Sequence, residues 1–464
     1  MAGKPLRRLR AFLAIALVAL AAPAFAQATG ENEPNLQVPA GSARYLPDAM
    51  PDRIIATPAQ DPATGFAVNW RTNARVDVAL LQIARAGDSP DVGTPREVRA
   101  TTTAYTLDGR AAHVHRADVG GLQPDTLYMF RVQGQGAWSG WRQLRTAADA
   151  GKPLTLLYFG DSQNKNLSHV GRVVREAMRH APDALMALHA GDHQSNATVD
   201  NEWGEMFEAL GDLPSVMLVA PAAGNHEYWE EFEDTPQERR VLSGHWRAGF
   251  ALPRNGAGGA HTRDTTYWFD VQGVRVAVLD GTSALDLGSA DAQARWLESV
   301  LAGNPNPWSI VLIHQPVYSP RGREASGVIR SALQPVIERH GVDLVLQGHD
   351  HTYGRRSGDR AGQSLPQYIV SVSGPKLYRL SDEARRTMDP TAEDTQLFQV
   401  LRIDGTHLRY QARTATGRLY DDFEITRAAD GRKTLREIRQ GRIGLRDCSH
   451  RDATLGGRTD RCWE

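Results

Sequence analysis

The sequence predicts an all-β sandwich followed by an α/β domain. Between about residues 51 and 148, short runs rich in Val, Thr and aromatic residues alternate with Gly, Pro and Asp turns, a pattern typical of all-β domains. After Lys152, apolar strand-like runs alternate with segments whose apolar residues recur every three or four positions, which predicts helices covering a sheet. The chain has 464 residues, enough for both domains and for terminal appendages.

The first domain is expected to be a scaffold built from strands. Its strand-like runs occupy residues 66–72, 78–84, 103–107, 113–119, 127–134 and 141–146. The stretch from Leu122 to Tyr128 resembles the tyrosine corner of fibronectin type III-like sandwiches, in which a Tyr hydroxyl bonds to nearby backbone. Trp70 stands where such a domain buries an aromatic ring between its sheets. Both aromatic residues also fit an ordinary core, which agrees with the same sandwich.

The second domain is predicted to run from residue 152 to residue 427. Its apolar runs, expected as strands, occupy residues 154–159, 184–190, 215–223, 308–313 and 342–347. Helical periodicity covers residues 167–180, 290–303 and 326–341, and a hairpin is expected to turn at Gln272-Gly273. Three further strand-like runs, at residues 397–404, 408–414 and 421–427, close the domain. Ligands are expected at the ends of the strands.

The two ends of the chain are predicted to lie outside these domains. Residues 1–26 have the features of a secretory signal peptide, namely basic residues, an apolar core and a small-residue cleavage site near Ala26. The protein is therefore expected to be periplasmic or secreted. Residues 27–50 are predicted to form a linker or a surface arm, and the charged residues 428–464 a tail.

Cysteine use and net charge limit the expected partners. The two cysteines, Cys448 and Cys462, lie close together near the C-terminus, and an oxidising compartment favours a disulfide between them. A reactive thiol or a metal ligand is the alternative, although no His or Cys cluster accompanies them. The formal net charge is −1, so neither nucleic acid nor an anionic membrane is expected as a partner.

Five polar stretches follow five of the apolar runs. They are Gly160-Asp161, Gly191-Asp192, Gly224-Asn225-His226-Glu227, His314, and Gly348-His349-Asp350-His351. Carboxylate, amide and imidazole groups brought to one sheet edge are the ligands that paired divalent metal ions need. Each stretch alone is a weak indication, because an Asp after a strand is often a helix N-cap and a lone His is often structural. Together they predict a two-metal hydrolytic centre.

The first three stretches suit different roles in such a centre. Asp161 and Asp192 would repel each other at one site unless cations lay between them, and Asp192 has two oxygens with which to bridge two metals. Asn225 offers a neutral oxygen ligand, which leaves the site positive enough to bind an anion. His226 need not contact a metal, because a nearby imidazole can bind a phosphoryl oxygen or protonate a leaving alkoxide. A structural role in the turn is the alternative for His226.

The remaining stretches add imidazoles. Residues two apart in an extended segment point the same way, so His349 and His351 can both face the centre, one for each metal. Asp350 would then point away and could accept a hydrogen bond from a ligand histidine. With this pair present, a ligand role also becomes the better interpretation of His314.

The order of these motifs resembles that of the calcineurin-like metallophosphoesterases and, within them, most that of the purple acid phosphatases. The resemblance covers about residues 51–427 and implies a four-layer α/β/β/α catalytic domain behind a fibronectin type III-like domain. It implies a metal-dependent phosphoric ester hydrolase, acid phosphatase-like, which hydrolyses small phosphomonoesters with a metal-bound hydroxide. A phosphodiesterase or nucleotidase using the same site, and a non-catalytic surface-binding protein of the same fold, are the alternatives.

The resemblance also assigns roles by matching position. It implies a first metal held by Asp161, Asp192 and His351. It implies a second metal held by Asp192, Asn225, His314 and His349. His226 would be the acid or phosphate-binding histidine, and with Asp192 it makes up the predicted catalytic pair.

Two positions depart from the pattern of the purple enzymes. Those enzymes carry a Tyr three residues after the second Asp, whose phenolate binds ferric iron, but this chain has Ser195 there. Gln163 stands where the wider superfamily has a His, and its amide is either a ligand of the first metal or a nearby, substrate-facing group. Without the hard phenolate the main preference for Fe(III) is lost, so two divalent ions such as Mn, Zn or Fe(II) are expected.

The candidate substrate-binding residues are Asn225, His226 and two arginines. Arg321 and Arg323 lie in the segment after the fourth polar stretch, where a guanidinium could clamp a phosphate in a bidentate way. Solvated loop arginines are the alternative. His193 and Gln194, beside Asp192, are further candidates to line the pocket.

Overall fold

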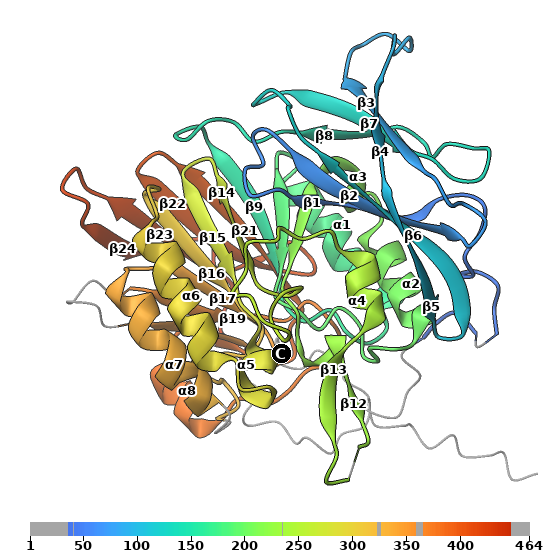
Figure 1. The fold of residues 1–464 in the computed structure, drawn as a ribbon. Coiled ribbons are helices and arrows are strands. Elements are labelled where there is room, and N and C mark those ends of the chain that lie inside the picture. Colours follow the sequence, from blue (N-terminus) through green and yellow to red (C-terminus); the bar gives the residue numbers. More distant parts are fainter. Residues whose placement is uncertain (1–35, 40, 234, 323–325, 359–364, 447–464) are drawn as a thin grey trace, which may run out of the picture.

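The computed structural model describes residues 36–39, 41–233, 235–322, 326–358 and 365–446 (Figure 1). The predicted signal peptide, Arg323, Cys448 and Cys462 lie outside these residues. Among the described helices, none combines the length and the apolar composition needed to cross a membrane.

The first domain is a sandwich of two antiparallel four-stranded sheets. One sheet has the order β1 (Asp52–Pro58), β2 (Phe66–Asn73), β6 (Arg110–Val119) and β5 (Thr101–Leu107). The other has the order β4 (Arg96–Arg99), β3 (Leu80–Arg85), β7 (Leu127–Val132) and β8 (Arg142–Arg145). Alternate residues from both sheets, including Val68, Leu81 and Phe130, are buried in the core between them. The predicted all-β sandwich is confirmed.

Two aromatic side chains fix the interior of this sandwich. Trp70 is buried, and its Nε1 donates a hydrogen bond to the carbonyl of Gln133 at 3.0 Å. The hydroxyl of Tyr128 accepts the backbone N–H of Gln123 at 2.9 Å, five residues upstream. This is the backbone contact expected of the corner motif.

The second domain contains two facing seven-stranded sheets. The first has the order β11 (Leu218–Pro221), β10 (Met186–His189), β9 (Leu154–Phe159), β21 (Leu397–Asp404), β22 (His407–Thr414), β23 (Leu419–Arg427) and β24 (Lys433–Glu437). The second has the order β14 (Tyr267–Val271), β15 (Val274–Val278), β16 (Trp308–Leu312), β17 (Leu344–Gln347), β19 (Gln367–Val370), β18 (Tyr353–Ser357) and β20 (Thr391–Ala392). Strands β9, β10 and β11 run parallel to one another, as do β15, β16, β17 and β19.

Helices cover the outer faces of these sheets, which gives the four-layer α/β/β/α arrangement. The inward side chains of the second sheet, such as Val276 and Ile310, share one core with Leu156 and Leu401 of the first. Its outward side chains, such as Val311, pack against α6 (Ala290–Ala302) and α7 (Ser326–Arg339). On the other side, α1 (Gly171–His180) packs on β21, with α2 (Asp200–Leu210) beside α1. The predicted fold class is therefore confirmed.

The remaining elements are short. They are η1 (Asn166–Val170), α3 (Leu213–Val216), η2 (Asn225–Glu227), the hairpin β12 (Tyr228–Glu231) and β13 (Arg239–Leu242), α4 (Gly244–Gly249), α5 (Gly281–Asp286) and α8 (Asp382–Thr387). The predicted turn between β14 and β15 is present, and both of its residues, Gln272 and Gly273, have positive φ. The hairpin β12–β13 projects from the body of the domain (Figure 1).

The segments predicted as arm and tail are partly structured. Tyr45 packs against Gly204 of α2 and donates a hydrogen bond to Glu208 at 2.6 Å, so the arm lies across that helix. In the predicted tail, β24 pairs with β23 and thereby extends the first sheet beyond residue 427. Charged residues mask this strand in the sequence, although Leu435 packs against the core and Arg446 is buried.

Candidate metal centre

The five polar stretches meet at one edge of the two facing sheets. They follow β9, β10, β11, β16 and β17, and because these strands are parallel within each sheet, their carboxyl ends lie on the same side. A hydrogen bond from the hydroxyl of Tyr158 in β9 to the carbonyl of Gln347 in β17 ties the two sheets together just below this edge. The fold therefore brings side chains from distant parts of the sequence into one cluster.

Two overlapping groups of donor atoms form within the cluster. One contains Asp161, Asp192 and His351, and the other Asp192, His314 and His349, with the donor atoms of each group within 4.8 Å of one another. All of these residues except His349 are buried. Asp192 belongs to both groups, which is the position that a bridging carboxylate occupies between two cations.

Asn225 lies beside the second group. Its Oδ1 is 2.9 Å from Nδ1 of His349 and 3.2 Å from Nε2 of His314. Nε2 of His314 is also 3.2 Å from Oδ2 of Asp192. In the first group, Nε2 of His351 is 3.5 Å from Oδ1 of Asp161. The structure thus assembles the predicted metal-binding residues into two neighbouring sets of donors.

Backbone carbonyls orient two of the imidazoles. Nδ1 of His314 donates to the carbonyl of Ala190 at 2.7 Å, and Nδ1 of His351 donates to the carbonyl of Lys376 at 2.8 Å. These bonds leave the Nε2 lone pair of each ring facing the carboxylates, which is how proteins present histidine to a metal.

The buried carboxylates of the cluster also favour a positive charge beside them. Burial raises the pKa of Asp161, and the neighbouring Asp192 adds to the rise. Burial acts against ionisation of Asp192 too, but His314 and His226 outweigh it and lower the pKa of this carboxyl group. Burial likewise opposes protonation of His314, yet Asp192 and Asp161 raise the pKa of its imidazole to about 10. A divalent cation would stabilise the ionised carboxylates in the same way as a protonated imidazole. The residues therefore fit a metal centre by donor type, orientation and charge.

Close packing at the loops explains two of the motif glycines. A Cβ on Gly224 would lie 2.3 Å from Oδ1 of Asp192, and one on Gly348 would lie 2.6 Å from Oδ2 of Asp161. Asp192, His349 and His351 themselves have φ values of 53°, 75° and 43°, in the left-handed region that costs non-glycine residues free energy. Such strain is typical of functional sites.

Glu227, whose role the sequence did not predict, holds two of the loops together. Its buried carboxylate accepts backbone N–H groups of Gly224 at 2.6 Å, Asp192 at 2.9 Å and His193 at 2.9 Å. Burial opposes its ionisation, but the charge and hydrogen bonds of His193 outweigh it and lower the pKa of Glu227. The only sequence feature that could have indicated this role is the position of Glu227 as the last residue of the Gly-Asn-His-Glu stretch.

His193 was expected to line the site, but its ring does not face the cluster of donor atoms. It is buried, bonds to Glu227 through Nδ1 at 3.2 Å, and stacks on His189 with ring centroids 3.9 Å apart. The side chain therefore supports the loop from behind.

The two positions that depart from the purple enzymes lie in or next to the cluster. Nε2 of Gln163 is 2.6 Å from Nε2 of His351, while its Oε1 is buried and has no hydrogen-bond partner among the described residues. Turning this amide over would bring Oε1 beside the imidazole lone pair, so that both atoms could contact one cation. The hydroxyl of Ser195 is buried and has no hydrogen-bond partner in the part of the chain that the structure describes. The backbone carbonyl of Ser195 accepts a hydrogen bond from Nδ1 of His226 at 2.5 Å.

His226 lies at the mouth of the centre. Because its Nδ1 donates to Ser195, its Nε2 is the atom turned toward the cluster, 3.9 Å from Oδ2 of Asp192. Its side chain is 29% exposed, in contrast to the nearly inaccessible Asp192. An approaching ligand can therefore reach this nitrogen.

Arg321 is connected to the first donor group by the aromatic ring of Tyr378, which contacts both Arg321 and His351. Its guanidinium carbon lies 3.6 Å from the ring centroid of Tyr378, and that ring lies 4.6 Å from the ring of His351. Lys376 and Tyr378 were missed by the sequence analysis because they follow no recognisable motif. Their segment is brought to the site by the strand β19 before it.

Comparison with known proteins agrees with this architecture. Residues 51–146 match the N-terminal domain of purple acid phosphatases, and residues 154–353 match the calcineurin-like phosphoesterases. Purple acid phosphatase 18 of Arabidopsis thaliana is 25% identical over 352 residues, which span 74% of this chain and 75% of that protein. Fe(3+)-Zn(2+) purple acid phosphatase 12 of the same plant is 22% identical over 66% of this chain and 65% of its own length.

A solved structure shows the same fold. Purple acid phosphatase PPD1 from yellow lupin (Lupinus luteus) seeds superposes with a TM-score of 0.69 at 18% identity, covering 82% of this chain and 75% of that one. The two matched domains account for more than half of the chain, in the order predicted from the sequence. The chain thus joins a purple acid phosphatase N-terminal domain to a calcineurin-like phosphoesterase domain and belongs to this family of metal-dependent phosphoric ester hydrolases.

Proposed function

We propose that this protein is an exported phosphatase that hydrolyses phosphomonoesters with two divalent metal ions. The observation that carries the proposal is the pair of donor groups that share Asp192. A single carboxylate common to two sets of ligands is suited to hold two cations a few ångströms apart. Export rests on the signal-peptide features of residues 1–26.

Each residue of the cluster has a defined part in this proposal. Asp161 and His351 would hold one cation, with Gln163 as a further oxygen donor. Asn225, His314 and His349 would hold the other, and Asp192 could contribute to both. When bound, the two cations would supply Lewis-acid stabilisation of a phosphoryl group and lower the pKa of water. Mn, Zn or Fe(II) suits this mixture of imidazole and oxygen donors better than Fe(III), because Ser195 offers no phenolate.

The other residues act on the substrate and its protons. Nε2 of His226 can hold a proton for the leaving alkoxide, while Ser195 fixes the ring through the opposite nitrogen. Arg321, placed by its contact with Tyr378, can attract the charge of the phosphate ester.

Hydrolysis of an aryl phosphate by the wild type and by Asp192→Asn tests the proposal. Asp404→Asn, at an exposed strand end far from the cluster in the fold, is the matched control. We expect activity in the wild type and control and a large loss in Asp192→Asn. Undiminished activity in Asp192→Asn would reject the proposed centre.

The substrate class needs a second comparison. A bis-aryl phosphate carries one charge less than the monoester and is bulkier, so we expect the monoester to be hydrolysed with the higher kcat/KM. Faster hydrolysis of the diester would show a phosphodiesterase instead. Sequencing the N-terminus of protein secreted by its own host tests export, and a mature protein that keeps residues 1–26 would contradict it.

A further inference from the structure

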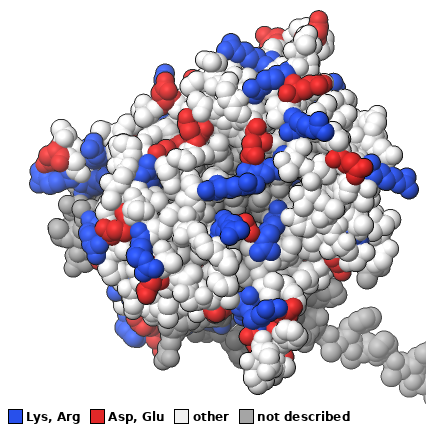
Figure 2. All heavy atoms as spheres, in the orientation of Figure 1, with Lys and Arg blue, Asp and Glu red and all other residues white. Residues whose placement is uncertain are grey.

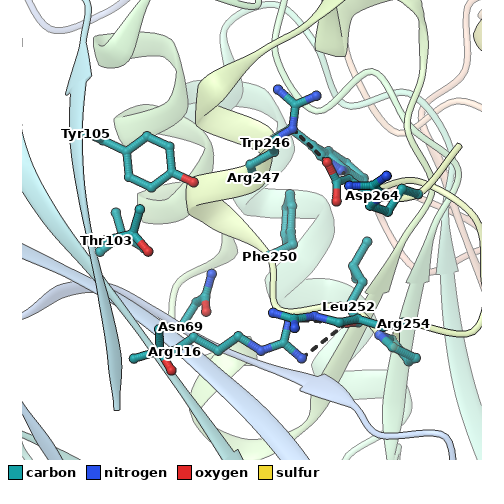
Figure 3. A pocket seen from close by; sticks show the side chains of 14 residues that line it. Asn69, Thr103, Tyr105, Arg116, Trp246, Arg247, Phe250, Leu252, Arg254 and Asp264 are labelled. Atoms are coloured by element: carbon teal, nitrogen blue, oxygen red, sulfur yellow. Dashed lines mark hydrogen bonds and ion pairs between the residues drawn. The ribbon is translucent and has the colours of Figure 1, made fainter. Parts of the chain in front are cut away.

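A cavity of about 220 Å³ lies between the two domains, separate from the metal centre (Figure 3). Strands β2, β5 and β6 of the sandwich form one wall, and α4 with the segment after it forms the other. Figure 3 shows Thr103 and Tyr105 on one side of this space and Arg247 and Phe250 on the other, with the hydroxyl of Tyr105 pointing across it.

Among the charged side chains that line the cavity, basic ones outnumber acidic ones. Its charged residues are Arg116, Arg247, Arg254, Arg263 and Asp264. Arg247 pairs with Asp264 at 2.7 Å. Arg254 and Arg263 are exposed and form no hydrogen bond or ion pair with another residue that the structure describes. Figure 2 shows a group of basic side chains near the middle of this face of the molecule. The cavity therefore favours an anion.

A buried acceptor in the wall lacks a donor. Asn69 is 3% exposed, and its Nδ2 donates to the carbonyl of Ala248 at 3.1 Å. Its Oδ1 is buried and accepts no hydrogen bond from any residue that the structure describes. Buried polar atoms nearly always have a partner, so this oxygen points to a ligand atom that carries a hydrogen.

We propose that this cavity binds a small organic phosphate that carries hydroxyl groups, such as a sugar phosphate. The phosphate would bind the two unpaired arginines, because guanidinium groups match phosphate oxygens in charge and geometry. A hydroxyl of the same ligand would donate to Oδ1 of Asn69. Sites for drug-sized ligands usually exceed about 300 Å³, so a cavity of about 220 Å³ suits a compact molecule.

The occupant would link the two domains behind the metal centre. Trp246 and Phe250 in the cavity wall lie 5.9 Å and 5.5 Å, between ring centroids, from the ring of His193. His193 bonds to Glu227, which holds the backbone of Asp192. A bound ligand would contact both domains and stabilise the packing of this loop. The site is independent of the proposed phosphatase activity.

Calorimetric titration with the phosphonate analogue of glucose 6-phosphate tests the site, because a phosphonate is not hydrolysed. The proteins are the wild type, Asp192→Asn to remove binding at the metal centre, Arg254→Gln/Arg263→Gln, and the control Arg295→Gln on the exposed face of α6. We expect a binding event in the wild type, Asp192→Asn and Arg295→Gln that is weakened by roughly a hundredfold in the double variant, about tenfold for each arginine.

Two further measurements keep the test specific. Hydrolysis of an aryl phosphate by the double variant should stay at the wild-type level, since neither arginine belongs to the metal centre. Orthophosphate should bind this site more weakly than the sugar phosphonate. Absence of binding to Asp192→Asn, equal affinity in the double variant, or equally tight binding of orthophosphate would overturn the proposal.

Discussion

The packing of the two domains depends on one buried carboxylate. Asp200, at the start of α2, is inaccessible to solvent and lies against three arginines of the sandwich. Its oxygens are 2.7 Å from Nη1 of Arg53, 3.1 Å from Nη1 of Arg71 and 2.9 Å from Nη1 of Arg110. Burial opposes ionisation, but His245, Arg53 and Arg71 outweigh it and lower the pKa of Asp200. We predict that Asp200→Asn strongly destabilises the protein.

The size of the effect follows from what the substitution leaves behind. Arg53 has no other carboxylate within ion-pair distance among the described residues, and its side chain is 10% exposed. Arg71 keeps Asp52, and Arg110 is more accessible than the other two arginines. Removing one partner of a buried ion pair destabilises proteins by about 3–5 kcal/mol, because a charge remains buried without compensation. We therefore expect a loss of about 3–5 kcal/mol in the free energy of unfolding.

Urea unfolding at pH 7 measures this loss, and Asp404→Asn at an exposed strand end serves as the control. Arg53→Gln and the double variant complete a cycle, in which we expect the two substitutions to be strongly non-additive. A loss below about 1 kcal/mol in Asp200→Asn would refute the reasoning, because such a value is typical of an exposed ion pair.

Three further outcomes are expected. Burial, with a smaller contribution from His113, lowers the pKa of His115 from 6.5 to about 4, so the folded state binds fewer protons between these values than the unfolded state. Stability should therefore fall by up to about 2 kcal/mol, after allowance for solvent screening, as the pH drops from 6.5 to 4. Urea unfolding should show a shallower decline in His115→Gln, and an equally steep one would contradict this cause. His226→Ala should lower kcat for an aryl phosphate about 10²- to 10⁴-fold without changing metal content, and a loss below tenfold would exclude proton transfer by this residue. Glu227→Gln leaves one acceptor oxygen for three backbone donors. It should therefore reduce the free energy of unfolding by about 1–3 kcal/mol and raise KM. An unchanged free energy of unfolding would show that the loops need no carboxylate.

The fold could be predicted largely because its local signals agree with one another. Runs such as residues 154–159 and 308–313 are apolar or aromatic except for one small hydroxyl residue each, as expected for strands buried on both faces, and α6 and α7 carry helical periodicity. β24 was missed because its charged residues resemble a tail and only Leu435 contacts the core. A strand at a sheet edge needs few apolar residues, so its sequence signal is weak.

The candidate site was easier to locate than to interpret. The donor residues are of types that metals select, and each follows a strand, so their convergence could be expected from the sequence. Their roles as ligands are still predictions. Other contacts join residues that lie far apart in the chain. They are the hydrogen bonds of Glu227 to the loops, the ring contacts of Tyr378 and the interdomain ion pairs of Asp200. No local pattern marks such contacts, because they arise only when the loops and domains pack together.

Metal analysis of protein isolated without added metal tests the central claim most directly. Elemental analysis by mass spectrometry should find two divalent ions per chain in the wild type and at most one in Asp192→Asn, because this carboxylate is common to both donor groups. Asp404→Asn should retain both ions. One ion or none in the wild type, or two ions retained in Asp192→Asn, would contradict a shared two-metal centre.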